Sequence, residues 1–229
     1  MNHLGGLHHL AICTANMKAQ IEYFTDVLGM ELVALYWMHG VPNTWHAFLR
    51  MNDESSVAFV HNPDIGEIPV ELGRTHAGNA AANSARGTMQ HVALRVKDEA
   101  ALLAMRDRIR SRGIPVLGPL DHGMCQSIYF AGPENLALEL ACSRESIDAR
   151  AWIDPEVQAL AGISATELAR YTKPAEFRDQ AGAVPQPPLD GPGPHMSNYP
   201  DDATYRMLMS FSDAELERMV DREPPVKVA

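Results

Sequence analysis

Hydrophobic and polar residues alternate with a period of two in four short segments near the start of the chain, and this pattern predicts β-strands. The predicted strands cover residues 7–14, 31–38, 44–51 and 56–61. Between the first two strands, apolar residues with helical spacing predict a helix over residues 17–28, and Gly29 follows where a left-handed C-terminal cap is expected. The order strand, helix and three strands predicts a βαβββ module over residues 7–62.

The same order returns after an interval. Predicted strands cover residues 89–96, 114–118, 124–131 and 136–142. A helix is predicted from its N-cap at Asp98 to Gly113. Counted from His9 and His91, the closing glycine follows after 20 residues in the first copy and 22 in the second. The spacing indicates an internal duplication of a unit of about fifty residues.

The rest of the chain differs in composition from the two modules. Residues 63–88 are rich in Gly, Pro, Asn and Ala and are interpreted as a linker. We expect residues 1–145 to form one domain, with modules at 7–62 and 89–142, and residues 146–229 to form an extension. The extension shows helical patterns near 155–171 and 202–220, a Pro/Gly-rich stretch at 184–200, and a capping-box pattern at Ser212. Packing or a subunit contact is the role favoured for it.

Composition narrows the function classes. Of the 229 residues, 46% are hydrophobic and 21% are charged, which is typical of a globular protein. The net charge of −10 argues against nucleic acid and anionic membrane partners, which require clustered Lys and Arg. Neither a membrane span nor a signal peptide is recognised, so a cytoplasmic location is expected. Three cysteines without CxxC spacing favour small buried thiols over disulfides or a zinc site.

Candidate metal ligands fall on one face of three predicted strands. Because successive side chains of a strand alternate between its faces, His9, His91 and Glu139 lie opposite the large aliphatic residues of their strands. The aliphatic residues need a helix over them, so the ligand faces form the open, concave side, where the neighbouring residues are mostly alanines. Two imidazoles and one carboxylate are costly to bury unpaired, and a cation removes that cost. The alternative is two satisfied core histidines and a Glu139–Arg95 ion pair.

The duplication also selects among neighbouring residues. His91 aligns with His9, whereas Gln90 aligns with His8, so His9 is the candidate ligand in the first module. Ser127 and Tyr129 share the open face of their strand. The fold class expected is α+β, with paired βαβββ modules forming a curved mixed sheet around a metal site and a C-terminal helical extension.

On these residues the chain resembles the vicinal oxygen chelate superfamily, which includes glyoxalase I, bleomycin-resistance proteins and type I extradiol dioxygenases. The resemblance covers residues 7–142. It implies metal ligands on the first, fifth and eighth strands, which here are His9, His91 and Glu139. Glyoxalase I has a fourth ligand where this chain has Ala58. The remaining three-ligand set is that of non-haem Fe(II) oxygenases, so Fe(II) is the expected metal, with Mn, Zn or Ni as alternatives.

The segment around Tyr129 is similar to the tyrosine strand of the extradiol enzymes, and His122 lies close to the position where those enzymes keep a histidine outside the metal ligand set. The resemblance implies that Tyr129 orients a bound catecholate and that His122 moves protons. Those enzymes usually keep an acid–base histidine where this chain has Ser55, and His46 or His61 could replace it. Ser127, Trp45 and His61 are candidate substrate-binding residues, although core packing is an alternative for Trp45.

Ring cleavage of a catechol-like aromatic by dioxygen is therefore the leading functional hypothesis. Metal-dependent isomerisation, epimerisation or lyase chemistry through an enediolate is the alternative that Ser55 favours. A binding protein without turnover is the third, against which the intact ligand set argues. The expected partners are a small aromatic or vicinal-oxygen substrate, dioxygen and, by resemblance, a second copy of the chain in a dimer.

Overall fold

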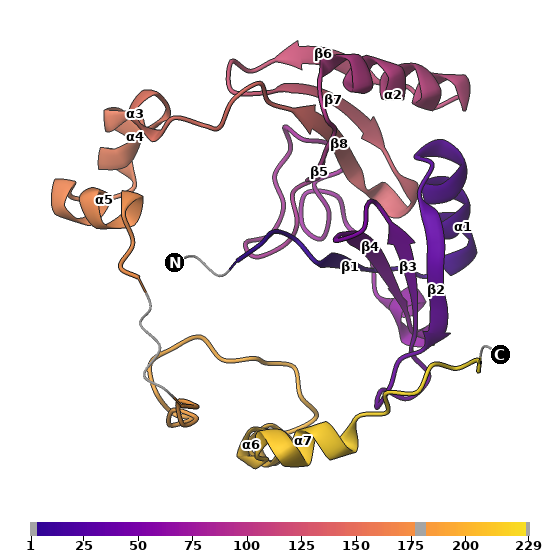
Figure 1. Ribbon diagram of the computed structural model, residues 1–229, viewed down its shortest axis with the longest axis vertical. Coiled ribbons are helices and arrows are strands. Elements are labelled where there is room, and N and C mark those ends of the chain that lie inside the picture. Colours follow the sequence, from indigo (N-terminus) through magenta and orange to yellow (C-terminus); the bar gives the residue numbers. More distant parts are fainter. Residues whose placement is uncertain (1–3, 177–181, 228–229) are drawn as a thin grey trace. The chain divides into compact units, whose positions relative to one another are not determined.

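The computed structural model describes residues 4–176 and 182–227 and divides the chain into two compact units. One unit, here called the module unit, comprises residues 4–38 and 42–174 and contains both predicted modules. The other, the C-terminal unit, comprises residues 39–41 with the chain from 175 onward, and its first three residues, 1–3, lie outside the described part. Figure 1 shows the elements of each unit.

The first module has the predicted order. It consists of β1 (His9–Cys13), α1 (Met17–Glu22), the π-helical turn η1 (Tyr23–Val27), β2 (Glu31–Trp37), β3 (Trp45–Arg50) and β4 (Ser56–His61). The strands form a sheet in the order β1-β4-β3-β2, in which β1 is parallel to β4 and the other pairs are antiparallel. The side chain of Asn16 caps α1 by accepting a hydrogen bond from the backbone N–H of Ala19.

The second module repeats this arrangement. After the 3₁₀ turn η2 (Pro63–Glu67) and the linker come β5 (Val92–Arg95), α2 (Glu99–Ser111), β6 (Leu117–Asp121), β7 (Gln126–Ala131), the turn η3 (Pro133–Asn135) and β8 (Ala137–Cys142). Its sheet has the matching order β5-β8-β7-β6, with β5 parallel to β8. Asp98 caps α2 as predicted. The α+β class and the duplication are thus confirmed, and the expected curved sheet consists of two four-stranded mixed sheets.

The buried faces of both sheets share one hydrophobic core. Phe24 of η1 packs edge to face on Phe59 of β4, and Leu102 of α2 is fully buried with Leu138 of β8. Both helices lie on the same side of the sheets (Figure 1). Small outward-facing residues such as Ala11 and Ala93 are exposed on the other side. The predicted assignment of aliphatic residues to the helix side and of His9 to the open side therefore holds.

Polar contacts join the modules across the core. The carboxylate of Glu134, in η3, accepts hydrogen bonds from the Thr14 hydroxyl at 2.5 Å and the Ala15 backbone N–H at 2.8 Å. The Tyr23 hydroxyl donates to the Ala131 carbonyl at 2.6 Å. Arg108 of α2 donates to the Val27 carbonyl at 2.8 Å. These contacts join the helical segments of each module to the other module and hold the two sheets together.

Three details differ from the sequence predictions. The sixth strand was expected at residues 114–118 but lies at Leu117–Asp121. The second half of the first predicted helix is π-helical. All three cysteines are free, but only Cys142 is buried, while Cys13 is exposed and Cys125 is partly exposed. The prediction of a buried thiol was wrong for Cys13 because this side chain projects from the open face of β1.

The C-terminal extension contributes helices to both units. The module unit contains α3 (Ala149–Trp152), α4 (Pro155–Leu160) and α5 (Ala165–Thr172). The C-terminal unit contains α6 (Asp202–Ser210) and α7 (Asp213–Met219), and α7 begins with the predicted capping box of Ser212 and Glu215. None of these five helices has a fully buried residue. Within the described ranges, no helix has the length and apolar character needed to cross a membrane.

Candidate metal centre

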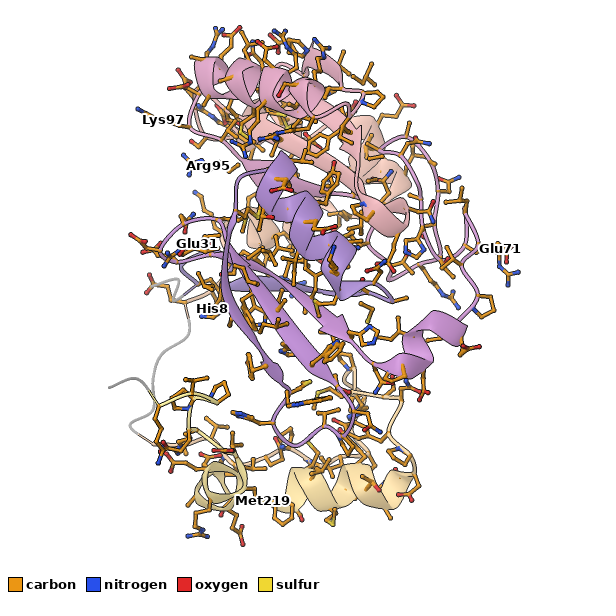
Figure 2. All side chains as sticks on the ribbon, turned by 90° about the vertical axis from the view of Figure 1, so that its right-hand side faces the viewer. His8, Glu31, Glu71, Arg95, Lys97 and Met219 are labelled. Carbon is orange, nitrogen blue, oxygen red and sulfur yellow. The ribbon has the colours of Figure 1, made fainter. Side chains whose placement is uncertain are left out.

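Two of the three predicted ligands meet at the open face of the second sheet. His91 lies immediately before β5, and Glu139 lies on the neighbouring β8, opposite Ala93. Nε2 of His91 is 2.9 Å from Oε2 of Glu139, whose side chain is only 6% exposed. Arg95, the other partner considered for Glu139, is an exposed residue at the surface (Figure 2). The carboxylate is thus paired with an imidazole.

Gln90 orients the His91 ring. The side-chain oxygen of Gln90 contacts Nδ1 of His91, and because an amide oxygen only accepts, Nδ1 must carry the proton. Nε2 of a neutral His91 then presents its lone pair to the Glu139 carboxylate. Two acceptor atoms at 2.9 Å repel unless a proton or a cation lies between them. A neutral imidazole fixed through its other nitrogen is the arrangement that metal-ligating histidines use, so this pair fits a metal.

His9 lies on the other sheet. Its Nδ1 is 2.8 Å from Nδ1 of His8, and its ring packs edge to face on Phe48 at 5.5 Å between centroids. In the described residues, no group of three or more His, Cys, Asp and Glu side chains is placed to hold a metal ion. The structure therefore brings together His91 and Glu139 but does not join His9 to them. The full ligand set stays a prediction.

Tyr129 and His122 extend the polar cluster. Tyr129 of β7 is the direct cross-strand neighbour of Glu139. Its hydroxyl is 3.0 Å from Nε2 of His122, in the turn between β6 and β7. Burial raises the pKa of Tyr129, and the charge of the nearby Glu139 adds to this effect. The phenol is therefore protonated at neutral pH and can donate a hydrogen bond to an oxygen of a ligand. Ser127, on the same face, is fully buried.

The positions considered for an acid–base residue differ in their contacts. Ser55 donates to the Leu7 carbonyl at 2.5 Å, which is a structural contact. The His46 ring lies beside Tyr36 and Phe48, on the same face as His9, and in the described structure neither ring nitrogen has a hydrogen-bond partner. Burial lowers the pKa of His46, and the nearby His9 lowers it further. A neutral His46 is therefore available to accept a proton.

Trp45 and His61 lie on the opposite side of the first sheet from His46. They are cross-strand neighbours whose ring centroids are 5.0 Å apart. Strand alternation places them on the same face as the buried residues Ala47 and Phe59. Nδ1 of His61 is 2.9 Å from the carbonyl oxygen of Thr14. The structure does not bring these two candidate substrate-binding residues to the other site residues.

Sequence reasoning missed three residues of these faces. Gln90 was noted only as the counterpart of His8, although its position next to His91 could have indicated an orienting role. Tyr36 and Phe48 flank His46, and their rings stack at 6.4 Å and 20°. The alternation of β3 places Phe48 on the same face as His46, so that signal was present in the sequence.

The comparisons with known proteins agree with this architecture. The family model described as "Glyoxalase/Bleomycin resistance protein/Dioxygenase superfamily" matches residues 6–140, and the chain belongs to this superfamily. No curated protein matches the sequence. The description covers glyoxalases, resistance proteins and dioxygenases, so membership establishes the family but not one activity.

Solved structures are similar at low sequence identity. A glyoxylase/bleomycin resistance protein/dioxygenase domain from Frankia sp. EAN1pec is 15% identical, with 62% of this chain and 99% of that chain covered and a TM-score of 0.49. A glyoxalase/dioxygenase from Nostoc punctiforme is 18% identical, with 62% and 94% covered and a TM-score of 0.46. TnmS3, an antibiotic binding protein from Streptomyces sp. CB03234, is 14% identical, with 61% and 97% covered and a TM-score of 0.43. Similarity of this degree does not bear on activity.

Proposed function

We propose that this protein is a metal-dependent dioxygenase that cleaves the ring of a catechol-like aromatic. The observation that carries the proposal is the continuous polar cluster of His91, Glu139, Tyr129 and His122 on one open face. Fe(II), held by His91 and Glu139 with His9 as the proposed third ligand, would supply the charge that favours an ionised catechol and a place for dioxygen beside it. Mn, Zn or Ni are the alternatives.

In the proposed reaction, side chains of this protein orient the catechol and accept its proton. Tyr129, protonated because its pKa is raised, donates a hydrogen bond to a catechol oxygen while its own oxygen accepts one from Nε2–H of His122. These hydrogen bonds would fix the catechol ring relative to the metal ligands, and orientation of the reactants supplies a large part of the rate enhancement in catalysis. His46, neutral at pH 7, takes the proton from a catechol hydroxyl. Tyr36 and Phe48 provide an aromatic surface beside it.

Enediolate chemistry is the second candidate, and one observation favours it. The Ser55 hydroxyl is used in a backbone contact, so the position where extradiol enzymes keep an acid–base histidine holds no such group. An isomerase or lyase requires a metal and a single base but no dioxygen, and His46 or His122 could serve as that base.

The test is reconstitution of the full-length protein with Fe(II) under anaerobic conditions, followed by dioxygen uptake on a panel of catechols. We expect uptake with formation of a yellow ring-fission product. Glu139→Gln and His91→Ala should each lower metal affinity by about tenfold to a hundredfold or more and abolish uptake. His195→Ala, which changes an exposed histidine of the C-terminal unit, is the matched control and should retain both.

Each other outcome assigns a different function. Tight metal binding without dioxygen consumption would replace the dioxygenase with enediolate chemistry. Stoichiometric binding of an aromatic without metal would identify a binding protein. Unchanged metal content in His9→Ala would remove His9 from the ligand set, and unchanged content in all three ligand variants would overturn the site.

A further inference from the structure

His122 lies in the turn between β6 and β7, whose backbone makes two hydrogen bonds within the turn. The His122 N–H donates to the Cys125 carbonyl at 2.9 Å, and the Gly123 N–H donates to the Asp121 carboxylate at 2.8 Å. Gly123 has φ of +79°, a conformation that favours glycine. Both bonds stay inside the turn, and the pairing of Asp121 with Gln126 holds its base in the sheet, so only the tip around His122 and Gly123 lies beyond the strand ladder.

A tryptophan from outside the two modules packs on this turn. A Cβ placed on Gly123 would lie 3.0 Å from Cη2 and 3.1 Å from Cζ2 of Trp152, so the indole ring lies directly against the glycine. Trp152 is 46% exposed, and the remainder of its surface is covered. The contact falls on the residue next to His122. It therefore supports the backbone from which the His122 side chain projects.

The segment that carries Trp152 is itself anchored. Arg144 forms an ion pair with Glu99, in the first turn of α2, at 3.4 Å. The Asp148 side chain accepts from the Arg150 N–H at 3.0 Å and pairs with the Arg150 guanidinium at 2.7 Å, which caps α3. The Trp152 N–H donates to the Asp148 carbonyl at 3.1 Å. Residues 143–152 are thus attached to α2 at one end and to the turn at the other.

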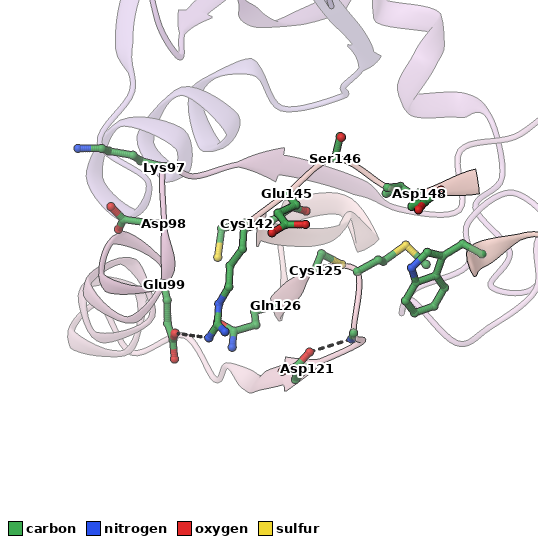
Figure 3. Close-up of a pocket in the computed structure, with 16 residues that line it drawn as sticks. Lys97, Asp98, Glu99, Asp121, Cys125, Gln126, Cys142, Glu145, Ser146 and Asp148 are labelled. Carbon is green, nitrogen blue, oxygen red and sulfur yellow. Dashed lines mark hydrogen bonds and ion pairs between the residues drawn. The ribbon is translucent and has the colours of Figure 1, made fainter. Parts of the chain in front are cut away.

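A cavity of about 670 Å³ lies between this segment, the turn and the start of α2. Figure 3 shows Asp121 and Cys125 of the turn on one side of it and Glu145 and Asp148 of the segment on another. Gly123 and Trp152 both line this cavity, so loss of the indole would enlarge it beside the tip of the turn. The tip would then have room to shift toward the cavity.

We propose that Trp152 is a positioning residue that holds His122 within hydrogen-bonding distance of Tyr129. The catalytic meaning of this inference rests on the proposed function, whereas the geometric claim does not. Trp152 lies outside residues 6–140, the part matched by the family model, so the extension contributes to the site through a contact that the two modules alone lack. The indole acts on the backbone of the turn and does not touch the proposed reacting groups.

The first test requires no metal and no substrate. Amide hydrogen exchange and histidine ring NMR are measured on the full-length protein, with the His122 ring signals assigned by their loss in His122→Gln. In Trp152→Ala we expect the His122 amide to exchange about tenfold faster and the His122 ring signals to shift, because local opening of the turn costs less free energy. Exchange in α2 should be unchanged, which shows that the variant is folded.

Two further variants complete this test. Trp152→Phe keeps an aromatic side chain but lacks Cζ2 and Cη2, the two indole atoms that lie against Gly123, so it should shift the His122 signals in the same direction as Trp152→Ala. Leu160→Ala removes a side chain that is 81% exposed at the end of α4 and should change nothing. A His122 amide and ring that remain as in the wild type in Trp152→Ala would overturn the proposal, and so would a Leu160→Ala variant that shows the same changes as Trp152→Ala.

The second test uses the catechol that is turned over in the reconstitution experiment. Trp152→Ala should lower kcat by about tenfold to a hundredfold, the cost of a small misplacement of a group that acts in the chemical step, with KM within about threefold. Trp152→Phe should also lower kcat, because it lacks the indole atoms that lie against Gly123. An unchanged kcat in Trp152→Ala would refute the positioning role. If no catechol is consumed while the NMR effects are present, the dioxygenase proposal fails and the positioning contact stands.

Discussion

At the scale of single residues, Glu134 shows how one side chain can join two modules that are far apart in sequence. Besides Thr14 and Ala15, its carboxylate accepts a hydrogen bond from the Gln20 side-chain amide at 2.8 Å. Burial alone raises the pKa of Glu134, but the hydrogen bonds from Thr14, Gln20 and the backbone outweigh this and lower it. A carboxyl whose pKa is lower in the folded protein stabilises the fold when it is ionised.

The pH dependence of stability follows from this sign. The contribution of Glu134 is complete above its ordinary pKa of 4.5 and is lost as the pH falls below that value through the lower folded pKa. We expect Glu134→Gln to lower the free energy of unfolding at pH 7 by about 1–2 kcal/mol, as for loss of hydrogen bonds to a charged group that is partly exposed. Urea denaturation at pH 7 and pH 4 measures the effect, which should shrink at the lower pH.

Glu54→Gln is the control, because Glu54 is an exposed carboxylate in the turn between β3 and β4, the counterpart of η3 in the first module. It should change the free energy of unfolding by less than about 0.5 kcal/mol. An effect of Glu134→Gln that is the same at both pH values would show that the carboxylate charge has no part in joining the modules.

Tyr23 gives a prediction at alkaline pH. Burial raises the pKa of Tyr23 to about 12. Because the folded pKa lies above the ordinary value of 10, the contribution of Tyr23 to the free energy of unfolding is fully present below pH 10 and is lost as the pH rises toward 12. In an absorbance titration of tyrosinate near 295 nm, Tyr23→Phe should remove a late-titrating step. Tyr199→Phe, in the C-terminal unit, is the control and should leave the late-titrating step in place. A Tyr23 step that ends near pH 10 would contradict its burial.

The sequence predicts residue positions well where strand alternation decides them. His91 and Glu139 face each other as the alternation of β5 and β8 requires, and Tyr129 joins them for the same reason. The Glu134 contacts were not predictable, because they join residues more than a hundred positions apart through a turn with left-handed backbone at Glu134. The absence of His9 from the pair has the same origin, since alternation fixes a face of one sheet but not the relation between two sheets.

At the scale of elements, the two glycines that close the repeated helices have the same backbone and different surroundings. Gly29 and Gly113 both have φ of +79°. A Cβ on Gly29 would lie 3.0 Å from Nη2 of Arg108, the side chain that joins α2 to the end of the first helical segment, whereas a Cβ on Gly113 would meet nothing within 4 Å. The duplicated position thus has an additional structural role in one copy.

This difference can be measured with two identical substitutions. Gly113→Ala should cost about 1 kcal/mol from the left-handed backbone alone. Gly29→Ala should cost more, by about 1 kcal/mol, because it also displaces the Arg108 guanidinium from the Val27 carbonyl. Both values come from urea denaturation. In an Arg108→Ala background the two costs should become equal, and a difference that persists there would show that Arg108 is not its cause.

Element boundaries were predicted less well where a local rule was overridden. The sixth strand was predicted to end at residue 118, but β6 continues through Pro119 because it is an edge strand, where a missing backbone N–H is tolerated. The π-helical turn η1 was not predicted because the apolar spacing in residues 17–28 continues through it. The helix caps, in contrast, depend on neighbouring residues only and were predicted correctly at Asp98 and Ser212.

At the scale of the whole molecule, buried residues are unevenly distributed. One hydrophobic cluster includes Leu49 and Phe59 from the first module and Ile128 and Leu138 from the second. By contrast, α6 and α7 of the C-terminal unit have no buried residue. Burial of apolar surface is the main source of stability. The modules are therefore expected to unfold as one, while the helices of the C-terminal unit contribute little to that transition.

Two core substitutions test whether the modules are one cooperative unit. Leu49→Ala in the first module and Leu138→Ala in the second each remove a side chain that is at most 1% exposed, and each should lower the free energy of unfolding by about 2–5 kcal/mol. Because the core is shared, both variants should shift a single transition, with circular dichroism and tryptophan fluorescence giving the same midpoint. Leu216→Ala in α7, where the side chain is 40% exposed, is the control and should leave that midpoint unchanged. If the modules were independent domains, Leu138→Ala would instead give two transitions, and the fluorescence of Trp37 and Trp45 in the first module would follow only the later one. That result would contradict the shared core. It would show that the contacts of Glu134, Tyr23 and Arg108 are too weak to couple the modules.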